Sequence, residues 1–311
     1  MNKDIIFLNP VCTHNIWGGT RLNREFGYPI EGDDIGECWG ISAHPNGDVT
    51  VASGAYKGMK LSELWEKHPE LFGNTGMDRF PLLIKIIDAK DDLSIQVHPD
   101  DAYAKVHENG SLGKTECWFI LDCKENATLV VGHNAKSREE LEQMIQEGKW
   151  KEFIREIPIK PGDFIQIDPG TVHAIKGGTL LLETQQSSDI TYRVYDYDRL
   201  SNGKPRQLHI TQSIDVITVP AKSAENSVVH TEKKDDAIQQ LICCPYYTVY
   251  RIDVEHRVET WQDKPFVLMS VVEGEGTLNG TPLKKGDHLI LPDGYGKVEL
   301  QGRMQIIAST I

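Results

Sequence analysis

The chain has 311 residues, enough for one large domain or two medium-sized domains with well-formed hydrophobic cores. Its formal net charge of −13 disfavours nucleic acid and membrane surfaces as partners, because both are negatively charged and repel an acidic protein. The apolar run at the start is too short for a secretory signal, and no later window approaches the roughly 18 apolar residues of a membrane helix. We therefore expect a soluble, cytoplasmic protein with no evident protein partner. The six cysteines lack CxxC spacing, which indicates reduced packing residues.

Short strands dominate the predicted secondary structure. Turn signals recur at short intervals, and the segments between them are rich in Val, Ile, Leu and Thr. The clearest of these segments are 80–87, 127–131, 179–183, 248–254 and 266–272. This rhythm is typical of an all-β barrel or sandwich.

Helices are few. The clearest is predicted over 137–154, where Ser137 and Glu140 form a capping-box pattern ahead of an apolar stripe. Two shorter helices are expected at 62–68 and 100–108, where a proline and an Asn-Gly pair, respectively, provide the stop signals.

Two features divide the chain. The segment 219–236 is polar and charged and lacks periodicity, which suggests a boundary. An internal repeat relates 161–173 to 285–297, since both segments read Gly-Asp, an apolar strand and then a Pro/Gly turn. The second copy has Lys297 where the first has His173, and an ammonium group offers no lone pair to a metal.

Three segments carry residues that suit a metal ion: 93–99, 113–118 and 168–173. Together they offer the imidazoles of His98 and His173, the carboxylate of Glu116 and the amide of Gln96, each on or beside a predicted strand. Side chains two apart on a strand share a face, so Gln96 and His98 point the same way. Taken singly, each residue has an ordinary turn or surface role, but their conjunction predicts a metal-dependent enzyme.

The pattern at 162–173 resembles the second metal motif of the cupin barrels, and 274–280 resembles the hairpin that precedes that motif in many of them. This resemblance implies two cupin-like (jelly-roll) barrels. Residues 1–220 would form a catalytic, metal-binding barrel that includes the helical segment 137–154. Residues 221–311 would form a degenerate barrel without a metal site.

Within the cupins, the metal-ligand segments together with Glu183, followed ten residues later by Arg193, resemble the mannose-6-phosphate isomerases in their short bacterial form. The resemblance covers nearly the whole chain, including 16–19 and 36–39. It implies an aldose-ketose isomerase that interconverts mannose 6-phosphate and fructose 6-phosphate, so the expected ligand is a phosphosugar. It also implies one Zn²⁺ per chain, held by His98, Glu116 and His173. Gln96 would be a fourth ligand or a contact to a substrate hydroxyl.

The same resemblance implies catalytic roles for Arg193, Glu183 and Lys114. Such a reaction moves one proton between C1 and C2 of the sugar through an enediol. Glu183 would carry that proton, with Lys114 or a metal-bound water as the alternative base, and Arg193 would add fixed positive charge where negative charge develops. The phosphate needs local donors within an acidic protein, and the candidates are Lys85, Ser94 and Arg199.

Two other functions are weighed against this one. A cupin Fe(II) dioxygenase usually places its acid two residues from the first histidine, whereas Glu116 lies 18 residues beyond His98. A sugar-phosphate-binding cupin without turnover would have no need of Glu183, Lys114 and Arg193 together. Both alternatives are disfavoured by these residues, and assay with and without a chelator separates them.

Overall fold

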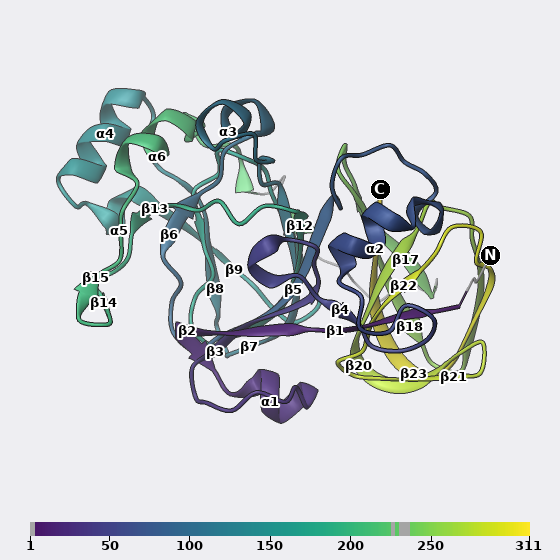
Figure 1. Cartoon of the computed structure of the whole chain (residues 1–311). Helices are drawn as coiled ribbons and strands as arrows, with labels where there is room; N and C mark the ends of the chain where they lie inside the picture. Colours follow the sequence, from purple (N-terminus) through teal and green to yellow (C-terminus); the bar gives the residue numbers. More distant parts are fainter. Residues whose placement is uncertain (1–3, 225–227, 230–236) are drawn as a thin grey trace.

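The computed structural model describes residues 4–224, 228–229 and 237–311. In this part of the chain the strands form three larger sheets and one small hairpin, with six short α-helices around them (Figure 1). The expectation of a β-dominated fold with a few short helices is therefore confirmed. No described helix is both long enough and apolar enough to cross a membrane.

Two sheets build the N-terminal part of the molecule. The seven-stranded sheet has the spatial order β16 (Val228–Val229), β10 (Phe164–Ile167), β7 (Glu116–Cys123), β12 (Thr179–Gln186), β5 (Leu82–Ala89), β2 (Val11–Gly19) and β3 (Ile35–Ile41). The five-stranded sheet has the order β13 (Tyr192–Tyr195), β6 (Ile95–Val97), β11 (His173–Ala174), β8 (Thr128–His133) and β9 (Ile154–Pro158). Both sheets contribute to one buried apolar cluster, with Trp118 and Ile165 from the first and Leu129 and Val131 from the second.

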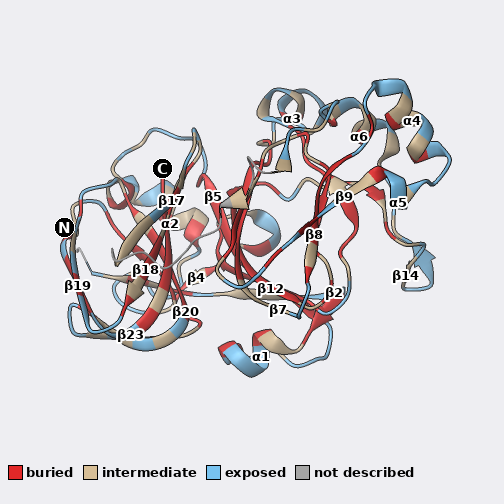
Figure 2. Ribbon diagram, turned by 180° about the vertical axis from the view of Figure 1, so that it is seen from behind, coloured by how far each residue is buried: buried red, intermediate tan, exposed pale blue. Residues whose placement is uncertain are grey.

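The central strands β5 and β12 are buried along their whole length (Figure 2). Their runs of Leu and Ile, with no apolar/polar alternation, are typical of strands covered on both faces. Lys85 lies within the apolar run of β5 and Glu183 directly follows that of β12, and these two residues are 4% and 3% exposed. Charged groups buried to this extent need partners, which makes the surface around them a candidate for function.

A third, nine-stranded sheet forms the C-terminal part. Its main path runs β17 (Ile238–Cys243), β18 (Thr248–Val254), β23 (Gly296–Thr310), β20 (Val267–Leu278), β22 (His288–Leu291), β1 (Ile6–Asn9) and β4 (Thr50–Val51). Off this path, β19 (Arg257–Gln262) pairs with β23 and β21 (Thr281–Lys284) pairs with β20. A separate apolar cluster fills this part, including Ile252, Met269 and Leu289. Two strands from the first 51 residues thus belong to the C-terminal sheet.

The internal repeat predicted from the sequence corresponds to two turns with the same backbone conformation and hydrogen bonding. Gly162 and Gly286 have φ of 90° and 91°, a region that glycine adopts without strain. The carboxylates that follow them accept a hydrogen bond from the backbone N–H three residues earlier, at 2.9 Å for Asp163 and 2.8 Å for Asp287. A strand then begins in each copy, β10 in the first and β22 in the second.

The two shorter helices lie close to where the sequence predicts them. The predicted segments 62–68 and 100–108 are observed as α2 (Leu61–Lys67), followed by the 3₁₀ turn Pro69–Phe72, and α3 (Asp101–His107). The remaining short elements are α1 (Arg21–Phe26), α6 (Ile210–Val216) and the 3₁₀ turn Pro45–Gly47.

The predicted segment 137–154 is not one continuous helix. It divides into α4 (Arg138–Gln146) and α5 (Trp150–Phe153), and Ile154 already belongs to strand β9. Gly148 lies between them with φ of 65°, the left-handed conformation that ends many helices. Ser137 does cap α4, because its hydroxyl accepts from the Glu140 N–H at 3.2 Å.

The division of the chain near residue 220 stays a prediction. Part of the proposed boundary segment, at 225–227 and 230–236, lies outside the described residues.

Candidate active site

The site lies between the two N-terminal sheets, and strand register brings its side chains into two rows. On the five-stranded sheet, Gln96 of β6 is paired with His173 of β11 on one side and with Arg193 of β13 on the other. On the seven-stranded sheet, Lys85 of β5 is paired with Glu183 of β12. Rigid neighbouring strands fix all of these side chains relative to one another.

The second row extends to a tryptophan at each end. Glu183 is in register with Trp118 of β7, and Lys85 is in register with Trp39 of β3. The Trp118 indole Nε1 donates to Glu183 Oε1 over 3.0 Å, and Lys85 Nζ lies 4.7 Å from the centre of the Trp39 ring. A cation over an aromatic face is an attractive arrangement, and it helps to hold the Lys85 side chain in place.

His98, Glu116 and His173 form a buried group that suits a metal ion. One ligand atom from each residue lies within 4.8 Å of the others, and among the described residues this is the one such group. The Nε2 atoms of the two imidazoles are 3.2 Å apart, and each lies 3.3 Å from a different oxygen of Glu116. All three residues are at most 1% exposed.

The hydrogen bonding of this group leaves ligand atoms available to a cation. His173 Nδ1 lies 2.9 Å from the Thr171 carbonyl oxygen, so Nδ1 carries the proton and Nε2 presents a lone pair. That lone pair faces the Glu116 carboxylate and the His98 ring, and the amide nitrogen of Gln96 lies 3.3 Å from Nε2. A histidine that donates its second N–H to a backbone carbonyl is usual for a metal ligand.

The charges around the group support two neutral imidazoles and an ionised carboxylate. Burial lowers the pKa of His173 below its usual value, and burial together with the charge of Lys114 lowers the pKa of His98 well below it. Burial alone would raise the pKa of Glu116, but the net shift is downward, and the positive charge of Lys114 is its main cause. These are the protonation states that a divalent metal requires of its ligands.

Lys114 belongs to the same group. Its Nζ lies 3.2 Å from Glu116 Oε2, and the residue is 4% exposed. Burial opposes the ammonium form of Lys114, but Glu116 and Glu183 outweigh it and raise its pKa. Lys114 is therefore a buried, positively charged donor beside the His-Glu-His group.

A cavity of about 160 Å³ borders on the neighbours of this group and is lined from both sheets. Lys114 and Gln96 line the cavity and contact the His-Glu-His group, and Lys85 and Glu183 form part of its wall. Lys85 Nζ lies 3.7 Å from Glu183 Oε2 and 3.5 Å from Glu37 Oε1. The cavity is therefore lined by alternating positive and negative groups, which suits a small, highly polar ligand.

Two arginines line the same cavity. Arg193 donates through one terminal nitrogen to the Gln207 carbonyl oxygen over 3.2 Å, while its buried Nε has no hydrogen-bond partner. Burial and the neighbouring charge of Arg206 lower the pKa of Arg193. An unsatisfied buried N–H and a second guanidinium nearby leave this side of the cavity ready for an anion.

The structure brings together most of the residues predicted from the sequence. Ser94 lines the cavity, and its hydroxyl donates to Gln96 Oε1 over 3.4 Å. Arg199, a candidate for phosphate contact, is not among the lining residues and instead binds Asp196 and the Asp92 carbonyl oxygen.

Sequence reasoning missed Arg206 and Asp189, which also line the cavity. Asp189 contacts His44 and Asn46 from the loop after β3. No local motif marks either residue, and only the fold brings them to the cavity.

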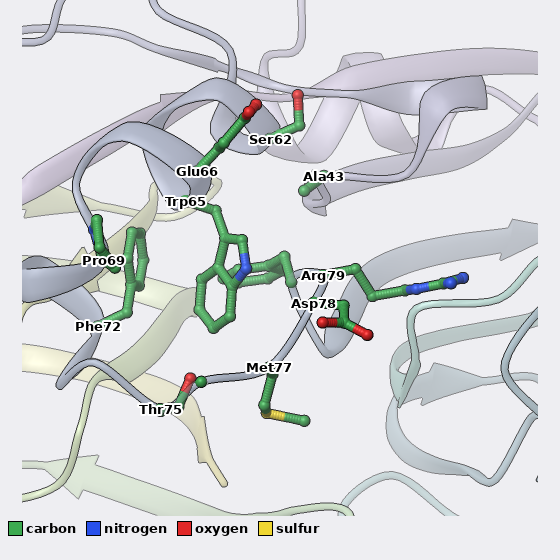
Figure 3. A pocket seen from close by; sticks show the side chains of 12 residues that line it. Ala43, Ser62, Trp65, Glu66, Pro69, Phe72, Thr75, Met77, Asp78 and Arg79 are labelled. Carbon is green, nitrogen blue, oxygen red and sulfur yellow. The ribbon is translucent and has the colours of Figure 1, made fainter.

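A second cavity, of about 490 Å³, lies away from this site (Figure 3). Its lining includes Trp65, Phe72 and Phe80, which pack with Phe266 in one aromatic cluster. Its lining contains none of the residues that contact the His-Glu-His group, whereas Lys114 and Gln96 line the smaller cavity, which remains the candidate active site.

Comparison with known proteins agrees with this geometry. The family model for the type I phosphomannose isomerase catalytic domain matches residues 5–119, and that for the mannose-6-phosphate isomerase cupin domain matches residues 237–311. The chain is 50% identical to mannose-6-phosphate isomerase ManA of Bacillus subtilis, with 99% of each chain covered. It is 48% identical to the mannose-6-phosphate isomerase of Streptococcus mutans, covering 98% of this chain and 97% of that protein.

Solved structures show the same relationship. The crystal structure of the mannose 6-phosphate isomerase from Bacillus subtilis has a TM-score of 0.93 at 49% identity, with 99% of each chain covered. A mutant phosphomannose isomerase from Salmonella typhimurium has a TM-score of 0.80 at 17% identity, covering 98% of this chain and 99% of that one, which shows the shared fold alone. By sequence identity over its whole length, and by fold, the chain belongs to the mannose-6-phosphate isomerase family, the type I phosphomannose isomerases.

Proposed function

We propose that this chain is a metal-dependent isomerase that interconverts mannose 6-phosphate and fructose 6-phosphate. One observation carries the proposal: a single small cavity has a His-Glu-His group beneath it and Glu183 and Arg193 in its wall. A proton carrier, a fixed positive charge and a candidate metal site are the groups that an aldose-ketose isomerisation requires.

The metal is proposed to be one Zn²⁺ per chain. Two imidazole nitrogens and one carboxylate are a ligand set that zinc uses in catalytic sites, where a position stays open for substrate. Gln96 is a candidate for a fourth ligand, since its side-chain amide lies 3.3 Å from His173 Nε2. Zinc held there would stabilise negative charge on the substrate oxygens, which lowers the cost of removing a proton from carbon.

Glu183 is proposed to carry the proton between C1 and C2. The Trp118 N–H fixes one of its oxygens, which leaves the other, Oε2, nearer the charge of Lys85. A carboxylate held in one orientation on a strand serves both carbons of a bound enediol from one face. Lys114, a charged donor at the base of the cavity, is proposed to move protons on the substrate oxygens.

Arg193 and Arg206 are proposed to have different roles. Arg193 follows Gln96 and His173 in register, so its charge is suited to the developing negative charge near the metal-ligating residues. Arg206 is suited to the phosphate, because a guanidinium group forms paired hydrogen bonds with phosphate oxygens. Lys85 and Ser94 remain candidates for contacts to the sugar.

A coupled assay tests the proposal. Purified protein should convert mannose 6-phosphate to fructose 6-phosphate, lose activity on treatment with a chelator, and regain it with Zn²⁺ but not with Mg²⁺. Turnover that is unaffected by exhaustive chelation would reject the metal-dependent mechanism. Binding of the phosphosugar without turnover would identify a binding protein, and oxygen consumption with Fe²⁺ would identify a dioxygenase.

The cytoplasmic location, like the absence of macromolecular partners, stays a prediction from the sequence.

A further inference from the structure

The segment between β13 and α6 carries Arg206 to the cavity on an exposed hairpin. Its strands β14 (Leu200–Ser201) and β15 (Lys204–Pro205) are joined by Asn202 and Gly203, with φ of 53° and 76°, as a tight two-residue turn requires. The hairpin extends away from the sheets in Figure 1, and Leu200 is 62% exposed. Apolar packing therefore does little to fix the direction of Arg206, and polar contacts have to do so.

Those contacts converge on Asp196, which directly follows β13. Arg206 donates to both of its carboxylate oxygens, from Nε to Oδ2 over 2.7 Å and from Nη2 to Oδ1 over 2.6 Å. Asp196 is 4% exposed, and it does not line the cavity. A paired Arg–carboxylate contact of this kind fixes the plane of the guanidinium group as well as its position.

Arg199 completes the arrangement from the other end of the hairpin. Its Nη2 donates to Asp196 Oδ1 over 2.6 Å, and its Nη1 donates to the Asp92 carbonyl oxygen over 2.5 Å. One buried carboxylate thus holds the residue before the hairpin and the residue after it. The base of the hairpin is tied to the body of the protein through Asp196.

The positive charges of Arg193 and Arg206 require a negative group nearby. Arg206 and Arg193 line one cavity, and the charge of Arg206 helps to lower the pKa of Arg193. Two guanidinium groups that face the same space repel each other, and the negative charge of Asp196 offsets part of that repulsion. Within the described residues, Nη1 of Arg206 makes no hydrogen bond, so its two N–H groups remain for a ligand.

We propose that Asp196 is a positioning residue that orients the Arg206 guanidinium in the cavity and thereby sets the affinity for the phosphate of the substrate. The inference rests on the proposed function in that the ligand is a phosphosugar. In setting the affinity for phosphate, Asp196 acts through Arg206, and it takes no part in proton transfer. Its loss should therefore weaken binding and leave the chemical step intact.

The test is a double-mutant cycle on the zinc-loaded, full-length protein. Asp196→Asn should raise the KM for mannose 6-phosphate, and the inhibition constant of inorganic phosphate, about tenfold, since a charge-assisted paired contact is lost. We expect kcat and bound zinc to stay within about twofold of the wild type. Asp196→Glu should restore part of the affinity, and inhibition by an uncharged polyol should not change.

Because Asp196 acts through Arg206, Asp196→Asn should have almost no further effect in an Arg206→Ala background. An equal loss in both backgrounds would overturn the proposal, as would an unchanged KM in Asp196→Asn. Arg206→Lys is a second variant that leaves Asp196 in place. It keeps the charge but not the paired geometry, and should raise the same two constants; wild-type constants would again overturn the proposal.

Glu299→Gln is the matched control, because Glu299 binds Arg257 over 2.6 Å on the C-terminal sheet, and it should behave as the wild type. Calorimetric titration of each protein with inorganic phosphate separates the positioning role of Asp196 from the proposed isomerase function. If phosphate binding weakens in Asp196→Asn and Arg206→Ala but no variant or wild type isomerises the sugar, the proposed function fails and the role of Asp196 stands.

Discussion

Trp118 and Glu183 are register partners on β7 and β12, and the indole N–H of Trp118 donates to Glu183 Oε1 over 3.0 Å. This contact fixes a buried carboxylate in one orientation beside the cavity. A Gln at position 183 keeps an acceptor oxygen for the indole but has no basicity. The contact therefore allows a substitution that tests proton transfer without disturbing the packing.

We predict that Glu183→Gln lowers kcat by about 10²–10⁴, the usual contribution of a positioned general base. Zinc content and the affinity for the phosphosugar should be retained, as measured by elemental analysis and calorimetry. In deuterated water the wild type should place some deuterium on C1 or C2, and this exchange should fall with the rate in the variant. If the variant isomerises at a near-normal rate, Lys114 or a metal-bound water is the better candidate for the base.

Arg193→Ala should lower kcat by about 10²–10³, because a preorganised donor to the developing negative charge is removed. The KM of Arg193→Ala should change less than that of Arg206→Ala. In Arg206→Ala we expect a raised KM and a kcat close to that of the wild type. Steady-state kinetics of the two variants side by side make the comparison. A normal kcat with a raised KM in Arg193→Ala would show that Arg193 holds the phosphate instead.

One zinc ion per chain is expected on elemental analysis, and none in the double variant His98→Ala/His173→Ala. Zinc at about a thousand times its dissociation constant should raise the free energy of unfolding by about 4 kcal/mol. This stabilisation should be absent in the double variant, as thermal melting with and without zinc will show.

Lys297→His is the control for the second barrel. Lys297 is exposed and pairs with Glu259 over 2.9 Å, so an imidazole there has no ligand set around it. The variant should still bind a single ion. Two tightly held ions in the wild type would contradict a single metal site.

His288 should make the stability depend on pH. Its ring is buried between Tyr28 Oη and Ser270 Oγ, each 2.8 Å from a ring nitrogen, and burial lowers its pKa from 6.5 to about 3. Between these values the unfolded chain binds a proton that the folded chain does not, so stability falls as the pH is lowered from about 6.5. Acidification from pH 7 to pH 5 should cost about 2 kcal/mol through this residue.

The measurement is urea unfolding at pH 7, 6 and 5 for the wild type and His288→Gln, both freed of metal. The variant should be less stable than the wild type at pH 7, but its free energy of unfolding should fall less as the pH is lowered. Titration of the other histidines is common to both proteins and cancels in the comparison. Parallel pH profiles would exclude His288 as a source of the dependence.

The sequence was informative where chemistry and local pattern coincide. His98, Glu116 and His173 lie in motifs that end or begin strands, and the structure brings them within 4.8 Å of one another. The break at Gly148 was missed because a single glycine is tolerated within a helical pattern, and only its φ of 65° shows that the chain turns there.

Arg206 was missed for a different reason. It lies beside a Gly-Lys-Pro turn segment, where a basic residue has the same local pattern as any solvated charge. Its importance depends on Asp196 and on the cavity, and both are consequences of tertiary structure.

The pairing of β1 with β22 has a consequence for how the molecule is made. Ile6 pairs with Ile290, so this contact joins residues 284 positions apart and cannot form until almost the whole chain has left the ribosome. Until then β1 lacks its pairing with β22. A fragment that began at residue 237 would lack β1, so one edge of β22 would be open to other chains. The pairing of β1 with β22 is thus completed late, and the C-terminal part should aggregate when it is produced without β1.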